Sequence, residues 1–384
     1  MRKVYLDNSA TTFPKPDSVI DAVADFMRYV GASPGRGGYS NSLEAGRIVF
    51  QTRKLINGFF NGPGIENVIF TQNITESLNM AINGIFKDGW HIITTSMEHN
   101  SVMRPLRTLQ EEGKIELTII KCDKNGFLNV GDVEKSIKDN TKAIVMTHAS
   151  NLVGTIMPAK EVGRICREHG LLFILDTAQS AGVVDIDFQK FNLDILAFTG
   201  HKALLGPQGT GGFLISPRAD AVMLPIIQGG TGSKSDEDIQ PDMLPDKYES
   251  GTLNAAGIAG LKAGIEFIEA TGIEKIREHE SKLLKMLIEG LHGIENIIIY
   301  GPMDVSKMTA VVSINLKSMD PSEFAYMLDR KYGIMARSGL HCAPYAHRTV
   351  GSYPIGSVRL SIGYFNTEDD IRYTLGAIRE IAKL

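Results

Sequence analysis

An aspartate and a lysine follow two successive apolar runs in the middle of the chain. Asp176 ends the run Leu171–Leu175, and Lys202 follows the next run, between Gly200 and Gly206. A lysine at such a strand end can form a Schiff base with an aldehyde, and a buried acid can hold a proton on a heterocyclic nitrogen. Pyridoxal phosphate (PLP) chemistry needs this pair. A helix cap at Asp176 and a solvated loop lysine at 202 are the alternative interpretations.

Donors for the phosphate of PLP stand at two other points of the chain. Thr75 and Glu76 open a helical pattern after a β-rich run, where free backbone N–H groups and a hydroxyl converge. Thr199 and His201 add side-chain donors just before Lys202. Simple helix capping explains Thr75 equally well. No phosphate loop and no Gly-x-Gly-x-x-Gly fingerprint is present, which disfavours a nucleotide cofactor.

Two further side chains have the chemistry of a binding site. His99 follows the β-rich run His91–Thr95 at a predicted helix start. Its imidazole could stack on a flat cofactor, although a capping or surface histidine is the alternative. Arg359 lies among apolar neighbours in the run Ser357–Ile362 and therefore needs an anionic partner. That partner is either a structural carboxylate or the carboxylate of a substrate, which the guanidinium would bind through two parallel hydrogen bonds.

The three cysteines stand in different settings. Cys166 lies within a helical pattern and Cys122 ends a β-rich run, which is typical of small core residues. Cys342 lies in a loop bounded by glycine and proline, with His341 and Arg337 nearby, and this electropositive setting favours a thiolate. An inert loop thiol is the alternative. The absence of any CxxC pair argues against a zinc site, and the sparse, odd count fits a reducing cytoplasm.

The elements that position these residues form an alternating pattern. Short apolar β-rich runs alternate with helical patterns, which predicts a large α/β domain with a mostly parallel seven-stranded sheet covered on both faces. Ligands in such sheets bind at the carboxyl ends of the strands, where the residues above fall. The seven runs are Asn67–Thr71, His91–Thr95, Ile115–Lys121, Lys142–His148, Leu171–Asp176, Leu193–Phe198 and Gly212–Ile215.

The alternation of β-rich runs and helical patterns ends at about residue 255. Long helical stretches there lead into separate strands and a final helix from Thr367, which predicts a smaller α+β domain. We therefore expect a large PLP-binding domain over residues 15–255 and a small domain formed by residues 1–14 and 256–384.

Composition and charge exclude several classes of protein. The chain has 384 residues, of which 43% are apolar and 22% charged, so it is neither disordered nor fibrous. Its formal net charge of -4 argues against binding to nucleic acid or to an anionic membrane. No apolar run approaches the length of a membrane span, and charges at the N-terminus stand where a signal peptide needs apolar residues. We expect a soluble cytoplasmic protein.

Taken together, the motifs resemble the cysteine desulfurase and selenocysteine lyase branch of the class V aminotransferases, which are fold-type I PLP enzymes. The similarity runs from the segment 5–12 to the segment 359–367 and so covers nearly the whole chain. Its most specific pieces are Asp176–Gly182, Thr199–Lys202, Glu249–Asn254 and Arg337–Ala343.

The resemblance implies roles around the cofactor ring. Lys202 would carry PLP as the internal aldimine and later move the α-proton of the substrate. Asp176 would pair with the pyridinium nitrogen, and Gln179 would approach the phenolic oxygen. His99 would stack on the ring.

The resemblance also implies a phosphate site and a dimer. Thr75, Thr199 and His201 would hold the phosphate, and Glu76 belongs to the same group of cofactor-binding residues. Thr252 would come from the second subunit of a homodimer. Thr199 replaces the serine that is more usual in relatives, which keeps the hydroxyl.

On the substrate side, the resemblance implies that Asn151 and Arg359 bind the carboxylate. Cys342 would attack the sulfur of cysteine, release alanine and keep a persulfide for a sulfur-acceptor protein. A selenocysteine lyase, or a class V aminotransferase acting on a small amino acid, is the alternative, although amino transfer has no use for a thiol. No metal is implied. The chain has Gly35 before Arg36 where relatives often have histidine.

Overall fold

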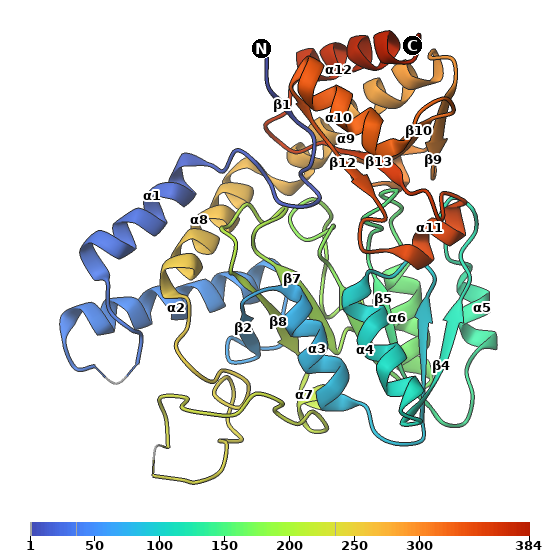
Figure 1. The fold of residues 1–384 in the computed structure, drawn as a ribbon. Helices are drawn as coiled ribbons and strands as arrows, with labels where there is room; N and C mark the ends of the chain where they lie inside the picture. Colours follow the sequence, from blue (N-terminus) through green and yellow to red (C-terminus); the bar gives the residue numbers. More distant parts are fainter. Residues whose placement is uncertain (1, 36, 235) are drawn as a thin grey trace.

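A seven-stranded sheet occupies the centre of the computed structural model, which describes residues 2–35, 37–234 and 236–384 (Figure 1). The strand order is β2-β8-β7-β6-β5-β3-β4, and only β8 runs antiparallel to its neighbours. The predicted α/β class and the mostly parallel seven-stranded sheet are therefore confirmed. Arg36 lies outside the described residues. The strands are β2 (Val68–Thr71), β3 (Trp90–Thr95), β4 (Ile115–Ile120), β5 (Thr141–Thr147), β6 (Leu172–Asp176), β7 (Ile195–Thr199) and β8 (Gly211–Ile215).

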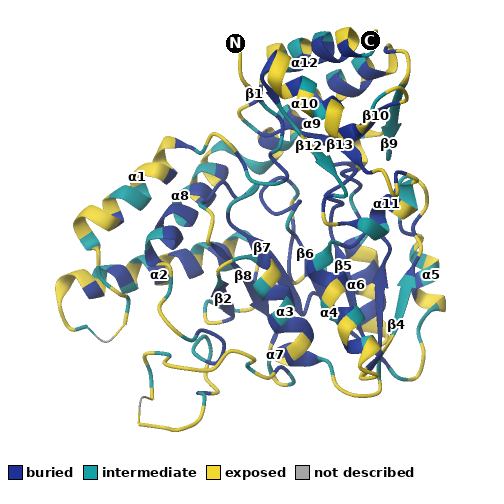
Figure 2. Ribbon diagram, in the orientation of Figure 1, coloured by how far each residue is buried: buried dark blue, intermediate teal, exposed yellow. Residues whose placement is uncertain are grey.

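Both faces of this sheet are buried, which explains why its strands are almost wholly apolar (Figure 2). Successive residues of β5 alternate between the faces: Ile144 and Met146 pack on one side, Ala143 and Val145 on the other. One face is covered by α3 (Ile74–Ile85), α4 (Asn100–Glu111) and α7 (Pro217–Asp220). The other is covered by α2 (Ser40–Phe59), α5 (Val130–Lys135), α6 (Ala159–Glu168) and α8 (Ala255–Thr271).

An N-terminal arm extends the second of these layers. It consists of α1 (Asp17–Asp25), the π-helical turn η1 (Phe26–Val30) and α2, and α8 packs against both α1 and α2. The outer surface of this arm is exposed, as the yellow stretches on α1 and α2 show (Figure 2).

The C-terminal part of the chain builds a second hydrophobic core. A four-stranded antiparallel sheet has the order β12-β13-β10-β9, and β1 from the N-terminus pairs in parallel with β11 beside it. Val4 and Leu6 therefore pack with the C-terminal helices, not with the large sheet. The elements are β1 (Val4–Tyr5), α9 (Ile273–His292), β9 (Ile297–Tyr300), η2 (Val305–Lys307), β10 (Val311–Leu316), α10 (Pro321–Tyr332), β11 (Ile334–Met335), β12 (Arg337–Gly339), α11 (Pro344–Val350), β13 (Ser357–Ser361) and α12 (Glu368–Ile381).

The domain boundary at residue 255 stays a prediction. The packing of α8 on α1 and α2, and of its apolar side chains in the core of the large sheet, favours a boundary after that helix. Within the described residues, no helix combines the length and the apolar composition that crossing a membrane requires.

Candidate active site

A cavity of about 490 Å³ lies at the carboxyl ends of the central strands. Because β3, β5, β6 and β7 are parallel, the residues at and after their ends meet at one edge of the sheet. The cavity has the size of a small-molecule site. Its predicted lining residues are Thr75, His99, Asn151, Asp176, Gln179, Thr199, His201 and Lys202, and its other lining residues are Asn73, Ile74, Ser101, Thr147, Ala149 and Ala178.

Asp176 and Lys202 are the charged groups of this cavity; Asp176 is buried, and Lys202 is half-buried. Asp176 Oδ1 accepts the N–H of Ala178 at 2.9 Å, so the carboxylate also caps the turn that follows β6. Burial raises its pKa, while that N–H and the Lys202 cation act in the opposite direction. Burial lowers the pKa of Lys202 to about 8, and Asp176 partly offsets the effect. A neutral, nucleophilic amine is therefore accessible near physiological pH.

His99 is both a helix cap and a cavity residue. Its Nδ1 accepts the N–H of Ser101 at 3.0 Å as the N-cap of α4. Burial lowers the pKa of His99 to about 4, with further contributions from Lys202 and Arg359. We therefore assign a neutral ring whose proton is on Nε2. The capping interpretation is therefore confirmed, and the ring also lines the cavity, while stacking on a flat cofactor stays a prediction.

The phosphate-binding residues expected from the sequence carry unused hydrogen-bonding capacity. Thr199 Oγ1 and His201 Nδ1 are buried without a partner among the described residues. Burial, followed by Lys202, lowers the pKa of His201 to about 4. Thr75 stands in the first turn of α3, whose N-cap Asn73 accepts the N–H of Glu76 at 3.1 Å. Because buried polar groups are almost always satisfied, these residues fit a polar ligand such as the phosphate of PLP.

The N-terminal segment packs against residues of the site, a contact that the sequence did not predict. Gln179 Nε2 donates to the carbonyl of Ser9 at 3.0 Å, and Thr12 Oγ1 donates to the carbonyl of Lys202 at 2.9 Å. These bonds join positions about 170 to 190 residues apart. Segment 9–12 thus holds the side chain of Gln179 and the main chain of Lys202.

Arg359 forms an ion pair with a carboxylate of the same chain. Its side chain is only 2% exposed, and Nη2 lies 2.8 Å from Asp7 Oδ1. Nη1 donates to the carbonyl of Asn151 at 3.0 Å, while Nε has no partner among the described residues. Asn151 itself donates through Nδ2 to the carbonyl of His341 at 2.7 Å, and its Oδ1 accepts no hydrogen bond from any residue that the structure describes.

The loop that carries Cys342 is docked beside the cavity. The Cys342 thiol is exposed, and its carbonyl accepts the N–H of Asn100 at 2.8 Å, next to His99. At the far end of α11, Thr349 Oγ1 donates to Ser96 Oγ at 2.8 Å. Cys342 itself adopts a left-handed backbone with φ 55°, which costs a non-glycine residue about 1–2 kcal/mol. Tertiary contacts therefore hold the backbone that carries the thiol in place. Cys122 and Cys166 are buried, as expected of core residues.

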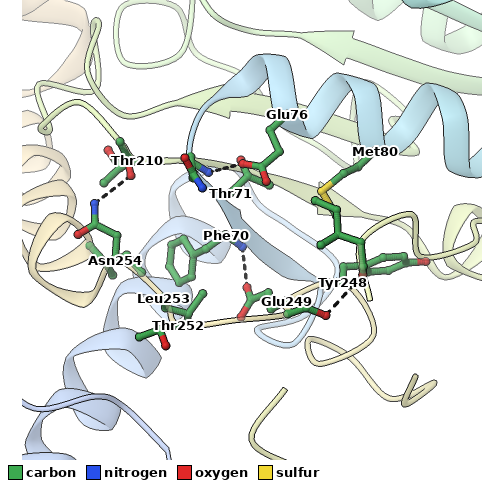
Figure 3. A pocket seen from close by; sticks show the side chains of 15 residues that line it. Phe70, Thr71, Glu76, Met80, Thr210, Tyr248, Glu249, Thr252, Leu253 and Asn254 are labelled. Atoms are coloured by element: carbon green, nitrogen blue, oxygen red, sulfur yellow. Dashed lines mark hydrogen bonds between the residues drawn. The ribbon is translucent and has the colours of Figure 1, made fainter. Parts of the chain in front are cut away.

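Two predicted cofactor residues lie outside this cavity. Thr252 and Glu76 line a separate pocket of about 260 Å³ (Figure 3). The Glu76 carboxylate accepts the N–H of Gln72 at 2.7 Å and faces this second pocket. Thr252 is exposed on a segment anchored by Glu249, which forms a buried ion pair with Arg53.

One buried acid next to the site escaped the sequence analysis. Glu98, directly before His99, is fully buried; Thr95 Oγ1 donates to one of its oxygens and the other has no partner among the described residues. Burial raises its pKa to about 8. Its position beside a candidate histidine was the available signal. Nowhere in the described parts of the chain do three or more His, Cys, Asp or Glu residues gather in a way that could hold a metal ion.

Comparison with known proteins agrees with this arrangement. The family described as aminotransferase class-V matches residues 4–373. A probable cysteine desulfurase of Pyrococcus abyssi is 37% identical over 99% of this chain and 94% of its own, and one of Methanothermobacter thermautotrophicus is 35% identical with the same coverage. The apo structure of a cysteine desulfurase from Thermococcus onnurineus NA1 superposes with a TM-score of 0.93 at 35% identity, covering 99% of this chain and 95% of the other. The chain belongs to the class-V aminotransferase family, in its cysteine desulfurase branch.

Proposed function

We propose that this protein is a PLP-dependent cysteine desulfurase, which converts L-cysteine to L-alanine and leaves a persulfide on Cys342. The observation that carries the proposal is the exposed Cys342 thiol, docked through Asn100 at the edge of the cavity that contains Lys202 and Asp176. The names of the curated relatives support the same activity.

The residues of the cavity would hold PLP in defined roles. Lys202 would bind its aldehyde carbon and Asp176 its ring nitrogen, while Thr75, Thr199 and His201 would hold the phosphate. Bound PLP supplies an electron sink that stabilises negative charge on the α-carbon of an amino acid. The neutral ring of His99 presents a flat face and an Nε2–H donor to the same space.

The chain's own groups would move the proton and the sulfur. Lys202, neutral above a pH of about 8, removes the α-proton of the substrate and returns it. The Cys342 thiolate forms a bond to the substrate sulfur as the Cβ–S bond breaks, and the electron pair remains on the carbon skeleton. A proton then takes the place of sulfur on Cβ, which gives alanine. The reaction exchanges one C–S bond for a C–H bond and forms an S–S bond, so it needs no external oxidant or reductant.

A second copy of the chain completes the proposed enzyme. The arm formed by α1, η1 and α2 exposes large apolar side chains, which are 55–72% exposed: Met27, Tyr29, Leu43 and Phe50. Burying such a face is typical of a permanent homodimer. Thr252 lies in a separate pocket, away from the cavity that holds Lys202 in the same subunit, and would then contribute to the partner's site. The three free cysteines support a reducing cytoplasm, and an acceptor protein would collect the sulfur at the exposed Cys342.

The test is product analysis with L-cysteine. Purified protein reconstituted with PLP should be yellow and should release alanine and sulfide in the presence of a reductant. Cys342→Ser should abolish sulfide release while PLP stays bound, and Cys166→Ser, which changes a buried thiol, serves as the matched control. A colourless protein would reject the cofactor, and unchanged desulfuration by Cys342→Ser would remove Cys342 from the mechanism. Formation of pyruvate or a 2-oxo acid without alanine would favour another reaction.

A further inference from the structure

Two arginines share one carboxylate beside the cavity. Asp7 Oδ1 lies 2.8 Å from Arg359 Nη2, and Asp7 Oδ2 lies 3.5 Å from Arg337 Nε. Arg337 in β12 stands directly opposite Arg359 in β13, so both side chains project from the same face of the sheet. The cluster therefore carries one more positive than negative charge and can accept one further anion.

The three side chains differ in their freedom to move. Arg359 is 2% exposed, Asp7 is 19% exposed and Arg337 is 51% exposed. The Asp7 main chain is fixed, because its carbonyl accepts the N–H groups of Ala10 and Thr11. Rotation of the Asp7 side chain is thus the simplest change that alters the partner of Arg359.

The contact between Asp7 and Arg359 engages only one of the two N–H donors on the Nε–Nη2 edge of the guanidinium. A carboxylate binds best along the Nε–Nη2 edge, where it accepts two parallel hydrogen bonds. Asp7 takes only Nη2, and Nε is buried without a partner among the described residues. Nη1 is already committed to the carbonyl of Asn151, which lines the cavity. The open edge of Arg359 is therefore a carboxylate site that Asp7 fills incompletely.

We propose that Asp7 is an internal carboxylate that occupies Arg359 in the substrate-free enzyme and yields it to the carboxylate of the amino-acid substrate, while Arg337 retains Asp7. This inference rests on the proposed function, which supplies that substrate. With one carboxylate bound, the cluster holds two positive and two negative charges. The arrangement selects amino acids over simple amines, because an amine without a carboxylate offers nothing that can replace Asp7 on Arg359.

The experiment measures equilibrium binding of L-alanine to the PLP-loaded enzyme through the change in its visible absorbance. Asp7→Asn frees Arg359, so L-alanine should bind about five- to tenfold more tightly, as expected when a competing state is removed. Ethylamine, which is alanine without the carboxylate, should change by less than about twofold, since it does not use Arg359. Asp132→Asn, an exposed acid on α5, is the matched control.

The Arg337→Gln variant should change L-alanine binding in the opposite direction. Without Arg337, Asp7 has no second partner and stays on Arg359, so L-alanine should bind more weakly. The double variant Asp7→Asn/Arg337→Gln should behave like Asp7→Asn alone. If Arg337 instead contacted the substrate carboxylate directly, the double variant would remain weak, and that result would overturn the proposal.

Unchanged or weaker L-alanine binding by a folded Asp7→Asn protein would also overturn it, because Asp7 would then only position Arg359. Thermal unfolding establishes whether that variant folds; if it does not, Arg337→Gln decides, and unchanged or tighter binding rejects the inference. Failure of L-alanine to bind the wild-type enzyme would reject the proposed function itself. Equal binding by all variants would reject only the role of Asp7.

Discussion

The proposed cofactor side of the site comes from the ends of strands in a sheet buried on both faces, whereas Cys342 stands on a loop of the C-terminal unit. Burial sets the protonation on the first side: Lys202 and two histidines have lowered pKa values. The Cys342 thiol is exposed. The difference follows from the tasks. A group that manages protons benefits from a low dielectric, and a group that hands sulfur to another protein must be reachable.

The largest expected effect tests the buried side. Lys202→Ala should lower kcat/KM for L-cysteine by at least about 10⁴-fold, the size of loss seen when the central group of a catalytic unit is removed. It should also abolish the visible absorbance of covalently bound PLP. Lys190→Ala, which removes an exposed lysine, should leave both unchanged. A kcat/KM of Lys202→Ala within tenfold of the wild-type value would show that the reaction does not depend on this lysine.

Asp176→Asn should have the next largest effect. The change keeps the shape of the side chain but removes the buried charge that we propose holds a proton on the cofactor nitrogen. We expect a loss of roughly 10²-fold or more in kcat, within the range of a positioned proton-transfer group. Steady-state kinetics at saturating PLP measure it. Loss of PLP affinity with an unchanged kcat would instead assign Asp176 to binding alone.

A pH dependence sharpens the buried side further. Only the neutral amine of Lys202 attacks the aldehyde of PLP, and burial lowers its pKa to about 8. The rate at which apoprotein recaptures PLP should therefore rise about tenfold per pH unit below 8 and level off above it. Stopped-flow absorbance follows this rate. A rate still rising to pH 10 would show that the lysine titrates as in water.

The smallest effect tests the exposed side. Cys342→Ser should change the free energy of unfolding by less than about 0.5 kcal/mol, because its thiol contacts solvent. Cys166→Ser should cost about 1–3 kcal/mol, because it places a hydroxyl in the fully buried core behind α6. Urea unfolding compares the two. Equal costs would mean that the Cys342 side chain is packed after all.

Local patterns correctly placed Asp176 and Lys202 together at the ends of strands, and long-range pairings escaped them. Asp176 and Lys202 could be placed because apolar runs mark strands and strand ends mark ligand sites. The partner of Arg359 was left open between a structural and a substrate carboxylate, because Asp7 lies 352 residues away in the chain. Likewise, nothing near Gln179 indicates its bond to Ser9. Sequence periodicity reports the burial of a residue, not the identity of its distant neighbour.

The docking of the Cys342 loop has a consequence for the speed of catalysis. Asn100 holds one end of the segment through the Cys342 carbonyl, and Ser96 holds the other end through Thr349. The intervening residues are largely helical, so their conformational entropy is lost when the protein folds. A mobile loop would lose that entropy in every turnover. Here only the side chain of Cys342 would have to be oriented for its thiolate to attack the sulfur of the substrate.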